Sequence, residues 1–126
     1  MNYLLDTHVY LWWQSNPEYL SDSARSAIKD VSNTIFVSAA VPWEITIKQR
    51  LGKLKVPEGI MDFMTIDNFL PLSISLDHIS ALSRLAHHHR DPFDRIQIAQ
   101  AVAEDLVLIT GDKQILKYTE VKTLKA

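Results

Sequence analysis

The chain has 126 residues, of which 47% are hydrophobic and 22% charged, and this size and composition predict one globular domain over residues 1–126. It has no cysteine, which excludes disulfides, thiolate metal sites and cysteine nucleophiles. The 13 Lys and Arg residues nearly balance the 15 Asp and Glu residues, so the overall basic charge of a non-specific nucleic-acid binder is excluded and any phosphate-binding surface must be local.

The beginning of the chain shows no export or membrane signal. Asp6 interrupts the first apolar segment, and no run of 18 apolar residues occurs anywhere in the sequence. We therefore expect a cytoplasmic protein that does not insert into a membrane.

The first part of the chain alternates short strands with helices. In chain order the predicted elements are a strand at 2–5, a helix at 7–14, a helix at 21–30, a strand at 34–37 and a helix at 41–51. Ser21 is a good N-cap for the second helix, whose apolar face would include Val31. Gly52 is typical of a helix C-terminus and ends the third.

The rest of the chain continues this alternation. The predicted elements are a helix at 58–69, a strand at 70–74, a helix at 76–86, a helix that opens at 91–92, a strand at 106–110, a helix at 113–118 and a strand at 121–124. The run LVLIT at 106–110 is typical of a strand buried on both faces. This order predicts an α/β fold in which helices cover both faces of a parallel sheet.

Acidic residues stand where predicted strands end or the following helices begin. Asp6 and Asp112 directly follow buried strands, and ligands of open α/β sheets bind beyond the carboxyl ends of the strands. Asp94 and Glu44 lie in the first turns of predicted helices. All four carboxylates could therefore meet at one edge of the sheet.

Such a cluster requires a compensating charge. Two carboxylates about 5 Å apart repel by roughly 3 kcal/mol at an effective dielectric constant of about 20. A set of carboxylates without cysteine favours Mg²⁺ or Mn²⁺ over zinc. Metal ions in such sites act on phosphates by activating a bound water.

The segments that carry these acids resemble those of the PIN-domain ribonucleases, and in particular the VapC-type toxins of bacterial type II toxin–antitoxin pairs. The matching segments are YLLDTH, PWEITIK, HRDPFDRIQIAQA and LVLITGD, which occur in the family's order between residues 3 and 112. The resemblance implies a sheet of about five parallel strands, an acidic pocket that binds Mg²⁺ or Mn²⁺, and endonucleolytic cleavage of RNA by a metal-activated water.

The resemblance also implies individual roles. The catalytic and metal-binding positions fall on Asp6, Glu44, Asp94 and Asp112. Thr110 falls where the family often has a supporting hydroxyl, and Asp91 is an additional acid of the DPFDR block. The implied partners are an RNA substrate, a cognate antitoxin that covers the site and a second copy of the chain in a homodimer.

Several of these residues also have a purely structural interpretation. Asp91 followed by a proline is typical of an N-cap, and the helix dipole favours an acid at Asp94 whatever the function. The basic residues after the Glu44 helix either guide RNA or form a solvated face; they are Lys48, Arg50, Lys53 and Lys55.

For two further clusters a structural role is the first interpretation. The histidines at 87–89 are interpreted as a solvated helix end, because consecutive helical side chains point about 100° apart and cannot form a zinc site. The aromatic residues Tyr10, Trp12 and Trp13 pack in the core or leave an apolar patch for a partner.

Two alternative functions remain open at this point. A receiver-like phosphoacceptor domain has a similar length and an acidic Mg²⁺ pocket, but Asp6 lacks the paired acid that such a domain needs. A non-catalytic α/β interaction module is the second alternative, and failure to bind Mn²⁺ would support it.

Overall fold

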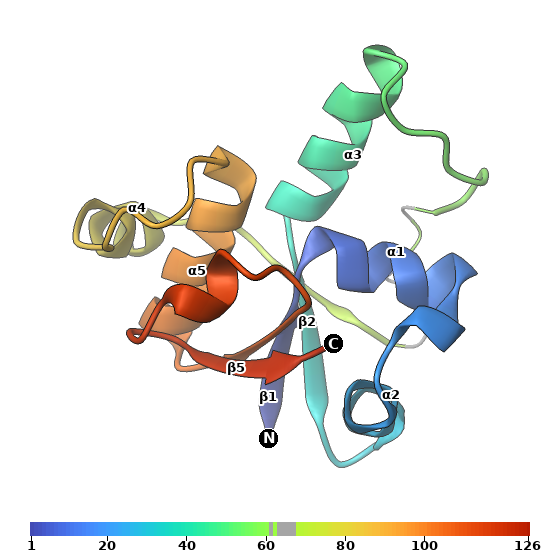
Figure 1. The fold of residues 1–126 in the computed structure, drawn as a ribbon, viewed down its shortest axis with the longest axis horizontal. Coiled ribbons are helices and arrows are strands. Elements are labelled where there is room, and N and C mark those ends of the chain that lie inside the picture. Colours follow the sequence, from blue (N-terminus) through green and yellow to red (C-terminus); the bar gives the residue numbers. More distant parts are fainter. Residues whose placement is uncertain (61, 63–67) are drawn as a thin grey trace.

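A computed structural model of the chain describes residues 1–60, 62 and 68–126. Within them, five strands form one parallel sheet in the order β3-β2-β1-β4-β5 (Figure 1). The strands are β1 (Asn2–Leu5), β2 (Thr34–Ser38), β3 (Leu70–Leu72), β4 (Val107–Thr110) and β5 (Lys122–Lys125). This confirms the predicted five-stranded parallel α/β sheet.

Helices cover both faces of the sheet, as predicted. In Figure 1, α1 and α2 lie on one side of the strands and α4 and α5 on the other. The helices are α1 (Thr7–Ser15), α2 (Asp22–Lys29), α3 (Ala40–Arg50), α4 (Leu76–Ser83) and α5 (Pro92–Glu104), with 3-10 turns η1 (Pro17–Tyr19) and η2 (Ile115–Lys117). No helix in the described part of the chain is long and apolar enough to cross a membrane.

The hydrophobic clusters on the two faces of the sheet follow from the two-residue period of the strands. Along β1, Leu5 packs with Val9 of α1 and Ile28 of α2, whereas Leu4 packs on the opposite face with Ile98 of α5 and Leu108. Leu4, Leu5 and Leu108 are completely buried. Burial of β1 and β4 on both faces explains why these strands read as continuous apolar runs.

The strand order places β1 at a topological switch point. The chain moves from β1 outward through β2 to β3, then returns to the other side of β1 with β4 and β5. The carboxyl ends of β1 and β4 lie next to each other, because Leu5 pairs with Ile109. The observed order differs from the 2-1-3-4-5 order of receiver domains, so the phosphoacceptor alternative is wrong.

Capping residues explain where the helices begin. Ser21 accepts a hydrogen bond from the Ala24 amide at the start of α2, as predicted. Gly52 follows α3 with a φ angle of 69°, a left-handed conformation that suits glycine.

Some predicted elements differ from the structure. Because α2 ends at Lys29, Val31 is fully exposed and does not belong to the buried face. Helix α4 ends at Ser83 instead of residue 86, and only a 3-10 turn forms within 113–118. The predicted helix at 58–69 falls partly on residues 61 and 63–67, which lie outside the described residues; the described part of that range is not helical.

Candidate metal and catalytic site

Asp6 is a buried carboxylate at the junction of β1 and α1. It is the N-cap of α1, and its Oδ1 accepts a hydrogen bond of 2.8 Å from the Val9 amide. Its Oδ2 accepts a hydrogen bond from the hydroxyl of Thr110. Burial raises the pKa of Asp6 to about 6 although both hydrogen bonds oppose the rise. A nearby positive charge would therefore stabilise the ionised form of this side chain.

Thr110 connects the ends of β1 and β4. Its Oγ1 donates to Asp6 and accepts a hydrogen bond of 3.0 Å from the Asp112 amide. Since Thr110 is completely buried, this hydroxyl fixes the position of Asp6 relative to the backbone of Asp112. The supporting role that the resemblance implies for Thr110 stays a prediction.

Asp112 lies in the loop after β4 and is more exposed than Asp6. Its Oδ1 accepts a hydrogen bond of 2.7 Å from the Gln114 amide, and its Oδ2 lies 3.0 Å from Nε2 of His89. Burial alone would raise the pKa of Asp112, but the hydrogen bonds from His89 and from backbone amides outweigh it, so the pKa is lower than usual. Asp112 therefore contributes a negative charge near neutral pH.

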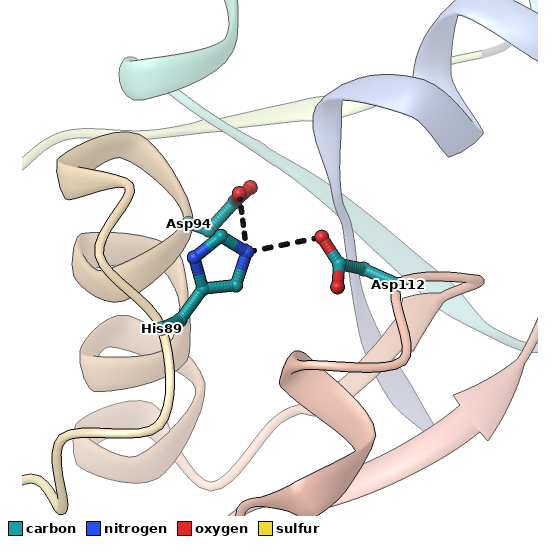
Figure 2. A group of neighbouring side chains, drawn as sticks. All are labelled: His89, Asp94 and Asp112. Carbon is teal, nitrogen blue, oxygen red and sulfur yellow. Dashed lines mark hydrogen bonds and ion pairs between the residues drawn. The ribbon is translucent and has the colours of Figure 1, made fainter.

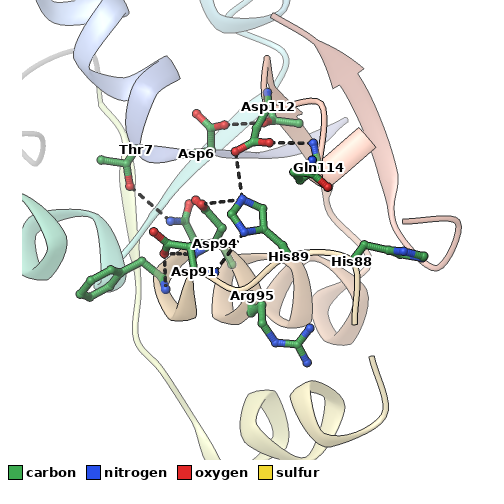
Figure 3. A network of polar contacts seen from close by, with 12 residues as sticks. Asp6, Thr7, His88, His89, Asp91, Asp94, Arg95, Asp112 and Gln114 are labelled. Atoms are coloured by element: carbon green, nitrogen blue, oxygen red, sulfur yellow. Dashed lines mark hydrogen bonds and ion pairs between the residues drawn. The ribbon is translucent and has the colours of Figure 1, made fainter. Parts of the chain in front are cut away.

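Asp94 lies in the first turn of α5. Burial raises its pKa to about 7, and the neighbouring charges of Asp91, Glu44 and Asp6 contribute to the rise. Figure 3 shows Asp6, Asp94 and Asp112 converging on one region at the carboxyl end of the sheet. The mutual influence of these charges is what the sequence predicted for carboxylates that meet at one edge.

Glu44 is buried in α3 and is held by two neighbours. Its Oε1 accepts a hydrogen bond of 2.6 Å from the Thr7 hydroxyl, and its Oε2 forms an ion pair with Lys48. Gln97 of α5 donates in turn to Oγ1 of Thr7, at 3.3 Å. These contacts connect α1, α3 and α5 around one carboxylate.

Asp91 occupies the N-cap position of α5, as its structural interpretation predicted. Its Oδ1 accepts hydrogen bonds from the amides of Phe93 and Asp94, at 2.8 and 3.2 Å. Its charge also raises the pKa of Asp94. Asp91 thus lies beside the acidic cluster while it caps the helix, and these two roles are compatible.

The basic residues divide into two groups. Lys48 is half-buried and pairs with Glu44, and this hydrogen bond raises its pKa. Arg50, Lys53 and Lys55 are exposed at and beyond the end of α3. Lys48 therefore has a place in the site itself, whereas the other three remain candidates for RNA contacts or a solvated face.

The aromatic residues of α1 also divide. Tyr10 is buried in the core, whereas Trp12 and Trp13 are half-buried against it. Trp12 lines a surface hollow of about 220 Å³ whose other lining residues are Asp6, His8, Gly111 and Asp112. One aromatic ring thus forms part of the wall beside two of the acids.

His89 is the site residue that the sequence interpretation missed. The histidines at 87–89 do not end a helix, because α4 stops at Ser83, and only His87 and His88 are exposed. The Nε2 atom of His89 lies 3.1 Å from Oδ2 of Asp94 and 3.0 Å from Oδ2 of Asp112 (Figure 2). The only signal in the sequence is its position two residues before the DPFDR block.

The residues present fit a divalent cation. Carboxylate oxygens are the ligands that Mg²⁺ and Mn²⁺ prefer, and burial penalises the ionised forms of Asp6 and Asp94. Ligand atoms of His89, Asp94 and Asp112 all lie within 4.8 Å of one another. A cation would offset the repulsion within this cluster.

Comparison with protein families and characterised proteins gives two matches. The PIN domain family matches residues 3–121. Ribonuclease VapC16 of Mycobacterium tuberculosis is 41% identical over 69 residues, which are 52% of this chain and 48% of that protein. The matched segment thus spans about half the length of this relative.

Solved structures share the complete fold. A chain in the crystal structure of VapBC2 from Rickettsia felis bound to a promoter DNA fragment superposes with a TM-score of 0.74 at 18% identity, covering 100% of this chain and 99% of that one. A chain of VapBC-1 from nontypeable Haemophilus influenzae gives a TM-score of 0.71 at 17% identity, covering 99% and 98%. At these identities the likeness establishes the fold.

Proposed function

The chain belongs to the PIN-domain family, and from this premise we propose that it is a metal-dependent endoribonuclease and the toxin of a toxin–antitoxin pair. The observation that carries the proposal is the approach of Asp94 to Asp112, with ligand atoms within 4.8 Å of each other, and the influence of the Asp6 and Glu44 charges on Asp94. The proposed site residues are Asp6, Glu44, Asp94 and Asp112. A purely structural role would not explain why carboxylates from separate elements approach one another while two of them, Asp6 and Glu44, are buried.

The comparisons support the ribonuclease assignment and the toxin role. The relative with 41% identity over 69 residues is a ribonuclease of the VapC type. The structures with the same fold come from VapBC complexes, and a VapBC-5 structure from M. tuberculosis is described as a member of a toxin–antitoxin family. By analogy we propose a cognate antitoxin as partner, a homodimer as assembly and the cytoplasm as location.

We assign Mg²⁺ or Mn²⁺ to the acidic cluster, held by Asp6, Glu44, Asp94 and Asp112. The chemistry that such an ion supplies is activation of a bound water as nucleophile and neutralisation of charge at the phosphate. Hydrolysis of an RNA phosphodiester in this way needs no covalent intermediate with the protein. The nucleophile does not have to come from a side chain, which agrees with a site built from carboxylates.

The protein's own residues hold the acids in position. Thr110 fixes Asp6, and Thr7 orients Glu44 through a hydrogen bond of 2.6 Å. Lys48 balances the charge of Glu44 from the same helix. The exposed basic residues beyond α3 would attract the RNA backbone toward this edge of the sheet.

The direct test is cleavage of a mixed RNA pool by the purified chain with Mg²⁺ or Mn²⁺. EDTA is the chemical control, and the variant Asp6→Asn is the matched variant because asparagine still caps α1. We expect cutting with metal, and loss of cutting in EDTA and in Asp6→Asn. Absence of Mn²⁺ binding by the folded wild-type chain would instead favour the non-catalytic interaction module.

A further inference from the structure

The backbone around His89 is held in place by hydrogen bonds to Tyr118 and Arg95. Its backbone amide donates a hydrogen bond of 3.0 Å to the hydroxyl of Tyr118. Tyr118 is buried, and its hydroxyl also accepts hydrogen bonds from the His88 amide, at 3.1 Å, and from Arg95, at 3.0 Å. Arg95 donates as well to the carbonyl of Ala86, at 3.0 Å, so the segment before α5 is pinned at both ends.

The ring of His89 is oriented by a second backbone group. The amide of Asp91 donates a hydrogen bond of 3.0 Å to Nδ1 of His89. A nitrogen that accepts a hydrogen bond carries no proton, so the proton of the neutral ring is assigned to Nε2. The Nε2–H group then points at Asp94 and Asp112, whose Oδ2 atoms lie 3.1 and 3.0 Å away (Figure 2).

This tautomer decides what His89 can do. A protonated Nε2 has no lone pair available for a metal ion, so in this geometry His89 is a hydrogen-bond donor and not a ligand. Each carboxylate has about four acceptor positions, so an oxygen that accepts from Nε2 can still face a cation. The two acids come from α5 and from the loop after β4, and His89 is the residue that bridges their Oδ2 atoms.

We propose that His89 is a positioning residue that holds the carboxylates of Asp94 and Asp112 at the separation that binds the divalent cation, without itself being a ligand. The cation itself belongs to the proposed function, on which this inference rests. Partners that orient metal-binding side chains in this way typically change metal affinity 10- to 100-fold when they are removed. The shared N–H donor also reduces the repulsion between two carboxylates that belong to different elements.

The test measures binding of Mn²⁺ and of Mg²⁺ to the full chain by calorimetry, for the wild type and three variants. His89→Leu removes the donor and keeps much of the volume, His89→Gln keeps an N–H donor at a similar distance, and His87→Ala is the control because His87 is exposed. We expect His89→Leu to weaken both metals by about 10-fold or more and by a similar factor. His89→Gln should recover most of the affinity, and His87→Ala should bind as the wild type does.

A spectroscopic measurement on the wild type needs no variant to fold. Electron spin echo spectroscopy of the Mn²⁺-loaded chain should show no nitrogen of a directly bound imidazole. Such a signal, or a loss of Mn²⁺ affinity in His89→Leu that far exceeds the loss of Mg²⁺ affinity, would make His89 a ligand and overturn the proposal.

Other outcomes are equally decisive. Unchanged affinity in a folded His89→Leu variant would overturn the proposal, and tighter binding would mean that His89 competes with the metal. If the wild type binds Mn²⁺ in a His89-dependent way yet cuts no RNA, the proposed function fails while the positioning role stands. If the wild type binds neither metal, both fail.

Discussion

Replacement of Asp6 by asparagine should make the metal-free protein more stable and at the same time inactive. Asp6 is buried, and its pKa is raised from 3.8 to about 6. Below pH 3.8 the carboxyl is protonated in both folded and unfolded chains, so its burial carries no ionisation penalty. Between pH 3.8 and about 6 the carboxyl is ionised in the unfolded chain but still protonated in the folded chain, so the folded state loses stability over this range.

The size of the effect follows from the pKa shift. A difference of about two pKa units at ~1.4 kcal/mol per unit is ~3 kcal/mol of lost stability above pH 7. Asparagine removes this penalty and keeps an oxygen that can accept from the Val9 amide, so the N-cap of α1 survives. We therefore expect Asp6→Asn to raise the free energy of unfolding by up to ~3 kcal/mol at pH 8, with most of the gain absent near pH 4.

Urea unfolding in EDTA at pH 4 and pH 8 measures this difference. Asp77→Asn is the control, because Asp77 is exposed on α4 and its replacement should change stability by less than about 0.5 kcal/mol. Addition of Mn²⁺ should stabilise the wild type and leave Asp6→Asn unchanged. If Asp6→Asn were less stable than the wild type at pH 8 in EDTA, burial of an ionised Asp6 would not be the cost that we infer.

Substitutions at three more positions test the supporting contacts. Thr110→Val removes the hydroxyl that connects Asp6 with the Asp112 amide. Urea titrations should show a free energy of unfolding that is lower by about 1–3 kcal/mol. An unchanged free energy of unfolding would mean that water replaces the hydroxyl. Asp91→Ala should lower the free energy of unfolding by about 1 kcal/mol, and Asp91→Asn should lower it much less, because asparagine can also cap α5. Loss of Mn²⁺ binding by a stable Asp91→Asn variant would instead identify Asp91 as a metal ligand. Lys48→Met leaves the buried carboxylate of Glu44 without its ion pair, so the melting temperature of the metal-free variant should be lower than that of the wild type. Mn²⁺ should then raise the melting temperature of the variant more than that of the wild type. Equal melting curves for the two proteins would refute the inference that Lys48 balances the charge of Glu44.

The parts of the site that the sequence predicted are those set by strand ends. Asp6 and Asp112 follow apolar runs that are buried on both faces, so their approach followed from the parallel sheet alone. Glu44 and Asp94 lie on helices, and their position depends on helix packing that a residue pattern does not specify. For these two residues the family resemblance carried the prediction.

His89 shows why the remaining part could not be predicted. Its role depends on a ring orientation that the Asp91 amide sets and on a loop that the Tyr118 hydroxyl holds. Tyr118 is 29 residues away in the sequence, and no periodicity reports such a contact. Val31 is a simpler case. Its helical spacing predicted a place on the buried face of α2, but the helix ends at Lys29 and Val31 is exposed.

The hydrogen bond between Thr110 and Asp6 joins residues 104 positions apart, and this separation has a consequence for synthesis on the ribosome. A nascent chain that stops before β4 already contains three of the four acids but lacks the strand that pairs with the second edge of β1. Closing so long a loop is a late event in folding. A chain that stops before β4 therefore cannot bring Asp112 to the end of β1, and the proposed site is complete only once nearly the whole chain has been made.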